Sequence, residues 1–75
     1  SRISETLLQL ADEQGEEQKT GIILRNRPSH QQLANMAGTT RETVSRVLKR
    51  LESQGYITTH GRSIVILREE HWLED

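Results

Sequence analysis

The sequence predicts a small α+β fold, with three main helices and an antiparallel hairpin near the end of the chain. Two segments, 29–36 and 41–54, carry apolar residues at helical spacing and begin at residues that cap helices. Two runs rich in β-branched residues, 56–59 and 63–67, flank a turn centred on Gly61. Because 75 residues are about half of an average domain, we expect one domain over residues 1–75.

The composition excludes several classes of protein. Hydrophobic residues make up 32% of the chain and Cys is absent, so we expect a small core without disulfides or thiolate metal sites. With one Trp and one Tyr, the chain lacks material for a deep apolar pocket, and we predict neither enzyme activity nor a cofactor. The spacing of His30, His60 and His71 fits no zinc pattern. The longest apolar run, 64–67, is far too short for a membrane span, and we expect a cytoplasmic protein.

Charge is distributed unevenly along the chain. The overall net charge is -1, but residues 21–62 hold seven Arg and Lys against two Glu, which leaves +5. The segments before and after this basic middle each carry -3. This asymmetry is expected when one face of a domain meets a polyanion, although scattered solvated charge is the alternative explanation.

The first part of the chain is predicted to form one helix and one short strand. Ile3, Leu7 and Leu10 recur at helical spacing, which predicts an amphipathic helix over residues 2–13. The polar stretch 12–21 contains two Gly and is predicted to be a loop. The β-branched run at 22–24 is predicted to be a small strand.

A short helix is predicted to run from Ser29 to about Met36. Ser29 and Gln32 have the spacing of a capping box, and Leu33 with Met36 forms the expected apolar stripe. Gly38 ends this helix, because glycine adopts the positive φ that a tight turn between helices requires.

The next helix is predicted over residues 41–54, capped by Thr39 or Thr40 and stopped by Gly55. Its buried stripe consists of Val44, Val47, Leu48 and Leu51. The opposite side, formed by Glu42, Ser45, Arg46 and Lys49, is polar. Glu42 and Arg46 are one turn apart, and we expect them to hold each other in position in the free protein.

Two short helices joined by a tight turn, followed by a hairpin, constitute a winged helix-turn-helix. A helix of this kind fits the major groove of DNA, where Arg recognises guanine and Glu accepts a hydrogen bond from cytosine. The wing, residues 57–67 with Gly61 and Arg62 at its turn, suits contact with phosphates. Residues 67–75 are expected to add one helical turn, in which Trp72 and Leu73 dock. We expect Trp72 to cover the core, and its alternative role is a contact with another domain or protein.

The residues of these elements resemble the C-terminal DNA-binding domain of the cyclic AMP receptor protein and fumarate/nitrate reduction regulator (Crp/Fnr) family. The resemblance rests on the segments 29–34, 37–38 and 41–52, on Gly55 and Ile57, and on the segment 60–65. Residues 2–11 also resemble the helix that opens this domain. The resemblance therefore covers nearly the whole chain and implies sequence-specific binding of double-stranded DNA.

The family's functional positions can be matched residue by residue. Those that read bases correspond to Arg41, Glu42, Ser45 and Arg46. Those that contact phosphates correspond to Ser29, His30, Gln31, Thr40, Thr43, Lys49, His60, Gly61 and Arg62. Glu42 and Arg46 favour a half-site with a TGA core, whereas Ser45 is typical of the oxygen-sensing branch and Arg41 of the cyclic AMP receptor branch. This mixture leaves the outer bases open.

The resemblance also implies partners outside these 75 residues. Family members carry an N-terminal sensor domain and a long dimerisation helix, so we expect this chain to be part of a longer homodimeric regulator at the bacterial nucleoid, dimerising weakly or not at all by itself. The sensor domain is expected to bind a cyclic nucleotide or another effector, and RNA polymerase is a further candidate partner. The alternative is a winged-helix module for protein contact, but the polar side of the helix 41–54 lacks the apolar patch that this requires.

Overall fold

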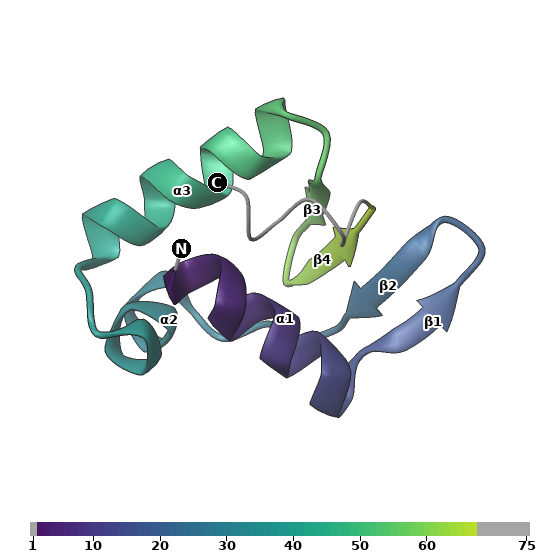
Figure 1. Cartoon of the computed structure of the whole chain (residues 1–75), viewed down its shortest axis with the longest axis horizontal. Helices are drawn as coiled ribbons and strands as arrows, with labels where there is room; N and C mark the ends of the chain where they lie inside the picture. Colours follow the sequence, from purple (N-terminus) through teal and green to yellow (C-terminus); the bar gives the residue numbers. More distant parts are fainter. Residues whose placement is uncertain (1, 68–75) are drawn as a thin grey trace.

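The computed structural model describes residues 2–67 and confirms an α+β winged helix-turn-helix fold. The helices are α1 (Arg2–Gln14), α2 (His30–Ala37) and α3 (Arg41–Ser53), and the strands are β1 (Glu16–Gln18), β2 (Gly21–Leu24), β3 (Ile57–His60) and β4 (Ser63–Ile66). The β1–β2 hairpin projects at the end of the molecule opposite α2 (Figure 1). The helical turn expected around Trp72 and Leu73 lies outside the described residues.

The four strands form one antiparallel sheet in the order β1-β2-β4-β3. The predicted wing is the β3–β4 hairpin, in which His60 pairs with Ser63 across the Gly61–Arg62 turn. Strand β2 pairs with β4, so that Ile23 lies opposite Val65. The short strand near the start of the chain is therefore part of the same sheet as the wing.

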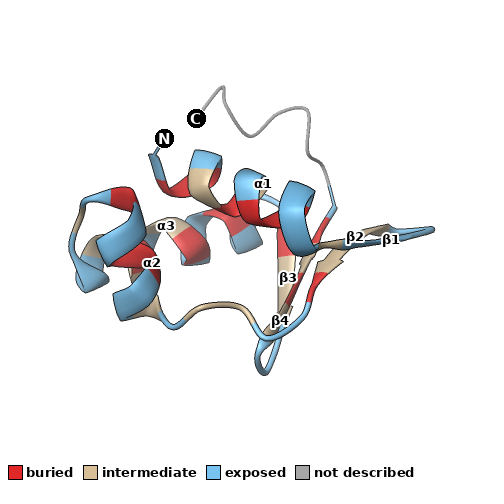
Figure 2. Ribbon diagram, turned by 90° about the horizontal axis from the view of Figure 1, so that it is seen from below, coloured by how far each residue is buried: buried red, intermediate tan, exposed pale blue. Residues whose placement is uncertain are grey.

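One core of apolar side chains lies between the helices and the inner face of the sheet. Helix α1 contributes Ile3, Leu7, Leu10 and Ala11, helices α2 and α3 contribute Leu33, Ala34, Ala37, Val44, Leu48 and Leu51, and the strands contribute Leu24, Ile57, Ile64 and Ile66. Figure 2 shows these buried residues on the inward faces of the helices, whereas the outward faces and the wing turn are exposed. Because helices and strands all supply this core, it fixes how α3 is presented.

The ends of α2 and α3 follow the predicted capping. The Ser29 hydroxyl accepts from the Gln32 amide at 3.1 Å, and the Gln32 side chain accepts from the Ser29 amide at 2.9 Å, which completes the capping box. Gly38 adopts a left-handed conformation with φ 71°, as expected for a helix stop. Of the two candidates for the start of α3, the structure shows Thr40 as the N-cap, with its hydroxyl accepting from the Thr43 amide.

The predicted apolar stripe of α2 was wrong at Met36. This side chain is 54% exposed, and the buried residues of the helix are Leu33, Ala34 and Ala37. Residues three apart (33 and 36) and residues four apart (33 and 37) both lie on the same face of a helix. In a helix of eight residues, periodicity alone does not show which of the two is buried. Alanines allow the close approach of α2 to its neighbours, and the larger Met36 is left at the surface.

The loop predicted over residues 12–21 was also wrong, because it contains strand β1. All three residues of β1 are exposed, so the sequence shows no alternation of apolar and polar side chains. The strand forms through backbone pairing with β2, and Glu16 accepts from the Arg25 side chain at 2.9 Å. Gly21, which starts β2 at φ 154°, leaves no room for a Cβ beside the carbonyl of Ile66.

Within the described part of the chain, none of the helices has the length and apolar character that crossing a membrane requires.

Candidate nucleic-acid interface

Helix α3 buries one side and exposes the other. Val44, Leu48 and Leu51 are buried, and Val47 packs partly buried against the core. Arg41, Glu42, Arg46 and Lys49 are exposed, whereas Ser45 is half-buried. The core therefore holds the apolar side and leaves the predicted base-reading side accessible, as a helix that enters a groove requires.

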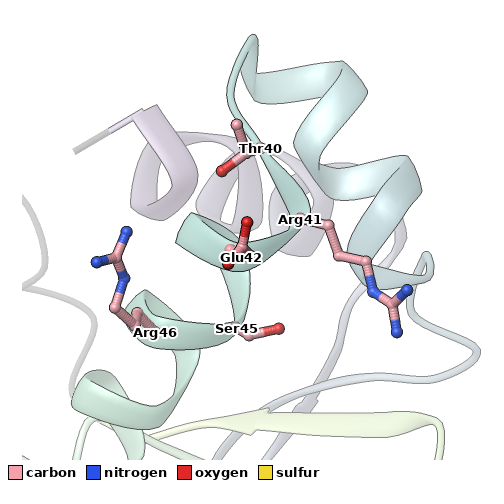
Figure 3. Close-up of a pocket in the computed structure, with 5 residues that line it drawn as sticks. All are labelled: Thr40, Arg41, Glu42, Ser45 and Arg46. Carbon is pink, nitrogen blue, oxygen red and sulfur yellow. The ribbon is translucent and has the colours of Figure 1, made fainter.

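The predicted base-reading residues lie together around a surface hollow at the start of α3. It is lined by Thr40, Arg41, Glu42, Ser45 and Arg46. Figure 3 shows the Arg41 and Arg46 side chains extending to opposite sides of Glu42, with the Ser45 hydroxyl on the side of Arg41. The Glu42 carboxylate accepts hydrogen bonds, and the guanidinium groups on either side of it donate them. Acceptors and donors at neighbouring points can pair with the donors and acceptors on the edges of successive base pairs.

A second hollow joins three segments that are far apart in the sequence. It is lined by Arg27, Ser29, His30, Gln31, Arg41 and Arg62. The amide of Arg27 donates to the carbonyl of Arg62 at 2.8 Å, which ties the wing turn to the loop before α2. Among residues 2–67, three arginines and no acidic side chain line this hollow, so it is suited to an anion such as a phosphate.

Arg27 is a candidate interface residue that neither a sequence motif nor the family resemblance indicated. Its Nη1 donates to the carbonyl of Pro28 at 3.2 Å, while its Nε is buried without a hydrogen-bond partner among the described residues. The only sequence signal for Arg27 was its membership of the basic middle segment. Its place beside the wing depends on the Arg27–Arg62 backbone contact, which the sequence pattern does not encode.

A third hollow connects the middle of α3 with the wing. It is lined by Arg27, His30, Ser45, Arg46, Leu48, Lys49, Glu52, Thr59 and Gly61. The Thr59 hydroxyl donates to Glu52 at 3.0 Å, which links β3 to α3. The second and third hollows share Arg27 and His30, so the wing and both helices of the helix-turn-helix border one continuous polar surface.

His30 and Ser45 are in direct contact. The imidazole Nδ1 of His30, the first residue of α2, lies 2.8 Å from the hydroxyl of Ser45 on α3. Burial, assisted by the positive charges of Arg27 and Arg41, lowers the pKa of His30 below its usual 6.5. The family resemblance implies a phosphate contact for His30 and a base contact for Ser45, but no sequence pattern indicates that the two side chains touch.

The remaining predicted residues differ in how they are placed. Thr43 lies beside the first hollow, where its hydroxyl is 2.9 Å from that of Thr40 and accepts from Arg46 at 3.4 Å. The expected ion pair between Glu42 and Arg46 was wrong, because the one ion pair within residues 2–67 is that of Arg25 with Glu16. Arg46 turns instead to Thr43, which leaves the Glu42 carboxylate open to solvent. His60 is exposed on the wing and lines none of the three hollows.

No cluster of three or more His, Asp or Glu side chains suited to a metal ion occurs between residues 2 and 67. His71, whose spacing from His30 and His60 fits no zinc pattern, lies outside the described residues.

The chain is similar to known regulators over most of its length. The model of the Crp-like helix-turn-helix domain matches residues 1–74. The cAMP-activated global transcriptional regulator CRP of Pasteurella multocida is 40% identical over 65 residues, which are 87% of this chain and 31% of that protein. The protein of the same name from Haemophilus influenzae is 38% identical over 65 residues, or 87% and 29% of the two chains. The chain thus spans about a third of these relatives.

Solved structures agree with the sequence comparison. The CO-dependent transcription factor CooA from Carboxydothermus hydrogenoformans superposes with a TM-score of 0.84 at 29% identity, covering 97% of this chain and 35% of that one. A CRP/FNR family transcriptional regulator from Thermus thermophilus gives a TM-score of 0.80 at 30% identity, covering 97% and 37%.

Proposed function

This chain belongs to the family of Crp-like helix-turn-helix domains, and on that premise we propose that it is the DNA-binding output domain of a longer bacterial transcription regulator. Its relatives are regulators of transcription, not enzymes, and they are about three times as long. We therefore assign it a role in binding and no catalytic role. The remainder of the regulator supplies the effector site, for a cyclic nucleotide or another small molecule, and the contacts that make a homodimer in the cytoplasm.

One observation carries this proposal. The exposed side of α3, the start of α2 and the wing turn border a continuous polar surface. It is lined by five cationic side chains, Arg27, Arg41, Arg46, Lys49 and Arg62, and by two acidic ones, Glu42 and Glu52. The cationic side chains outnumber the acidic ones, which suits contact with phosphates, and the Arg and Glu side chains on α3 suit the edges of the bases.

Within this surface, Arg41, Glu42, Ser45 and Arg46 read bases in a half-site with a TGA core. The backbone is contacted from the surface by Ser29, His30, Gln31, Thr40, Lys49, Gly61 and Arg62, and from beside it by Thr43 and by His60 on the wing. Support comes from the arrangement of α3, which presents Glu42 and Arg46 one turn apart and unpaired with each other. Both side chains are thus available to neighbouring base pairs.

Selection from a random pool of duplexes tests the function. The chain is joined through Ser1 to a dimerising coiled coil, because two half-sites about 34 Å apart normally share the binding energy. We expect enrichment of an inverted repeat with TGA in each half. The matched control is the Glu42→Ala/Arg46→Ala variant, which keeps the buried side of α3 and should enrich nothing. A pool that stays random with the unaltered chain would contradict sequence-specific binding, whereas a repeat without TGA would contradict only the core sequence.

The alternative role, protein contact alone, finds no support in the polar side of α3. The large hydrophobic side chains exposed within residues 2–67 are Met36 and Leu67, and neither lies on α3. Salt dependence separates the two roles. Binding through phosphates should weaken with a log-log slope of about -0.9 for each phosphate neutralised, whereas a protein-contact module should show a nearly flat dependence.

A further inference from the structure

The contact between His30 and Ser45 has consequences for what Ser45 can recognise. A serine hydroxyl has one hydrogen to donate and two lone pairs that accept. The imidazole Nδ1 of His30 lies only 2.8 Å from the Ser45 hydroxyl, so either the hydrogen or one lone pair of the hydroxyl is already engaged. What remains for a base depends on which of the two atoms, Nδ1 or Oγ, carries the shared hydrogen.

The contact joins two rigid elements. His30 opens α2 directly after the Ser29 capping box, and Ser45 lies in the second turn of α3. Both residues are half-buried, and both line the third hollow. The packing of α2 on α3 therefore sets the position of the His30 ring relative to the Ser45 hydroxyl, and neither side chain rotates freely in solvent.

The protonation of His30 decides the direction of the hydrogen bond. Within residues 2–67, the charged groups around the ring are Arg27 before α2, Arg41, Arg46, Lys49 and Glu52 on α3, and Arg62 on the wing. Cations predominate, which favours the neutral ring. A neutral imidazole has one N–H, and a phosphate oxygen can only accept a hydrogen bond. Since Nδ1 faces Ser45, the contact of His30 with a phosphate requires this N–H to be on Nε2. Nδ1 then has a lone pair, and the Ser45 hydroxyl must donate to it.

We propose that His30 is a specificity-determining positioning residue, which orients the Ser45 hydroxyl so that its oxygen accepts a hydrogen bond from an exocyclic amine in the major groove. The amines available there are N6 of adenine and N4 of cytosine. This inference rests on the proposed function, because it assumes that α3 reads bases. It adds a role in base discrimination to a residue otherwise assigned to the backbone.

Binding of the 75-residue chain to single half-site duplexes tests the inference. At low salt and about pH 8, well above the usual histidine pKa, affinities are measured for every single-base substitution of the selected half-site. Ser45→Ala first identifies the base pair at which Ser45 discriminates. We expect His30→Leu to reduce discrimination at that same base pair by roughly three- to tenfold, which corresponds to one net hydrogen bond. The double variant should lose no more discrimination than Ser45→Ala alone.

Two control variants separate this role from a plain phosphate contact. His60→Ala, on the wing and away from Ser45, should weaken all duplexes alike. His30→Asn keeps an amide oxygen near the position of Nδ1 and should restore discrimination at the Ser45 base pair. Uniform weakening of all duplexes by His30→Leu, or a failure of His30→Asn to restore discrimination, overturns the inference.

Deleting the amine tests the direction of the hydrogen bond. Purine in place of adenine, or pyrimidinone in place of cytosine, is introduced at the Ser45 base pair. We expect weaker binding by the unaltered chain and no change for Ser45→Ala and His30→Leu. Equal weakening of all three contradicts the inference. If the unaltered chain shows no base discrimination at any position, the proposed function itself fails. If it discriminates but His30→Leu leaves the Ser45 base pair unchanged, only this inference fails.

Discussion

The backbone amide of Arg27 lies 2.8 Å from the carbonyl oxygen of Arg62 and donates to it, which fastens the turn of the wing to the loop that leads into α2. This one contact places two arginine side chains from distant parts of the chain around a single hollow, together with Arg41. The polar surface thus depends on how the wing docks against the helix-turn-helix.

Replacing Glu42 or Arg46 by Ala is expected to cost about 1–3 kcal/mol in binding of the selected half-site and to relax the preference at one base pair. Both side chains are exposed on α3, so the free energy of unfolding should change little. Fluorescence anisotropy with specific and random duplexes measures the loss. Lys19→Ala, which removes a charge from the turn between β1 and β2, is the control. Equal losses on specific and random DNA would count against base reading by these residues.

Arg27→Gln is expected to weaken binding to all duplexes alike and to make the log-log salt slope shallower by about 0.9, the contribution of one phosphate. The reason is that Arg27 lines a hollow to which the described part of the chain contributes three arginines and no acidic side chain. Arg25→Gln is the matched control, because Arg25 pairs with Glu16 on the β1–β2 hairpin. An unchanged slope for Arg27→Gln, or the same change for Arg25→Gln, contradicts this assignment.

Leu33→Ala is expected to lower the free energy of unfolding by about 2–5 kcal/mol, because it removes a fully buried side chain from the core. Met36→Ala, on the same helix but 54% exposed, should change it by about 0.5 kcal/mol or less. Urea denaturation followed by circular dichroism measures both. Similar losses for the two variants would show that Met36 is part of the core after all.

Thr40→Ala is expected to lower the free energy of unfolding by about 1 kcal/mol, since its hydroxyl accepts from the Thr43 amide at the start of α3. Thr39→Ala leaves that cap intact and should have a smaller effect. Comparing the two variants by thermal unfolding without DNA isolates capping from any phosphate contact. A larger loss of stability for Thr39→Ala would show that Thr39, and not Thr40, caps α3.

The stability of the chain is expected to fall as the pH drops through about 6.5. Burial and the charges of Arg27 and Arg41 lower the pKa of His30 in the folded state. The unfolded chain therefore takes up this proton first, and acid shifts the equilibrium towards it, whereas above about pH 7.5 both states leave the ring neutral. Urea midpoints between about pH 5 and pH 8 measure the effect. His30→Asn should show a shallower dependence, and an identical dependence in both proteins would refute the role of His30.

Much of the fold could be predicted because its signals are local. The capping box at Ser29, the left-handed Gly38 and the stripe of Val44, Leu48 and Leu51 each depend on residues within two turns of one another. The same stripe indicated which side of α3 stays exposed, so the base-reading candidates were found from the sequence and the family resemblance. Met36 was misplaced because two spacings in a short helix give equally good apolar faces.

Other features depend on contacts between distant segments. Strand β1 has no apolar pattern of its own and exists through pairing with β2, which in turn pairs with β4. The contact of His30 with Ser45 and that of Arg27 with Arg62 likewise join residues from different elements.

By itself, the amino-acid sequence determined the helices, their ends and the charge carried by each segment, because backbone capping and side-chain periodicity act over a few residues. Only the tertiary structure decided which polar side chains meet. That outcome depends on how the elements pack around one shared core, and packing between distant segments leaves no repeating pattern in the chain.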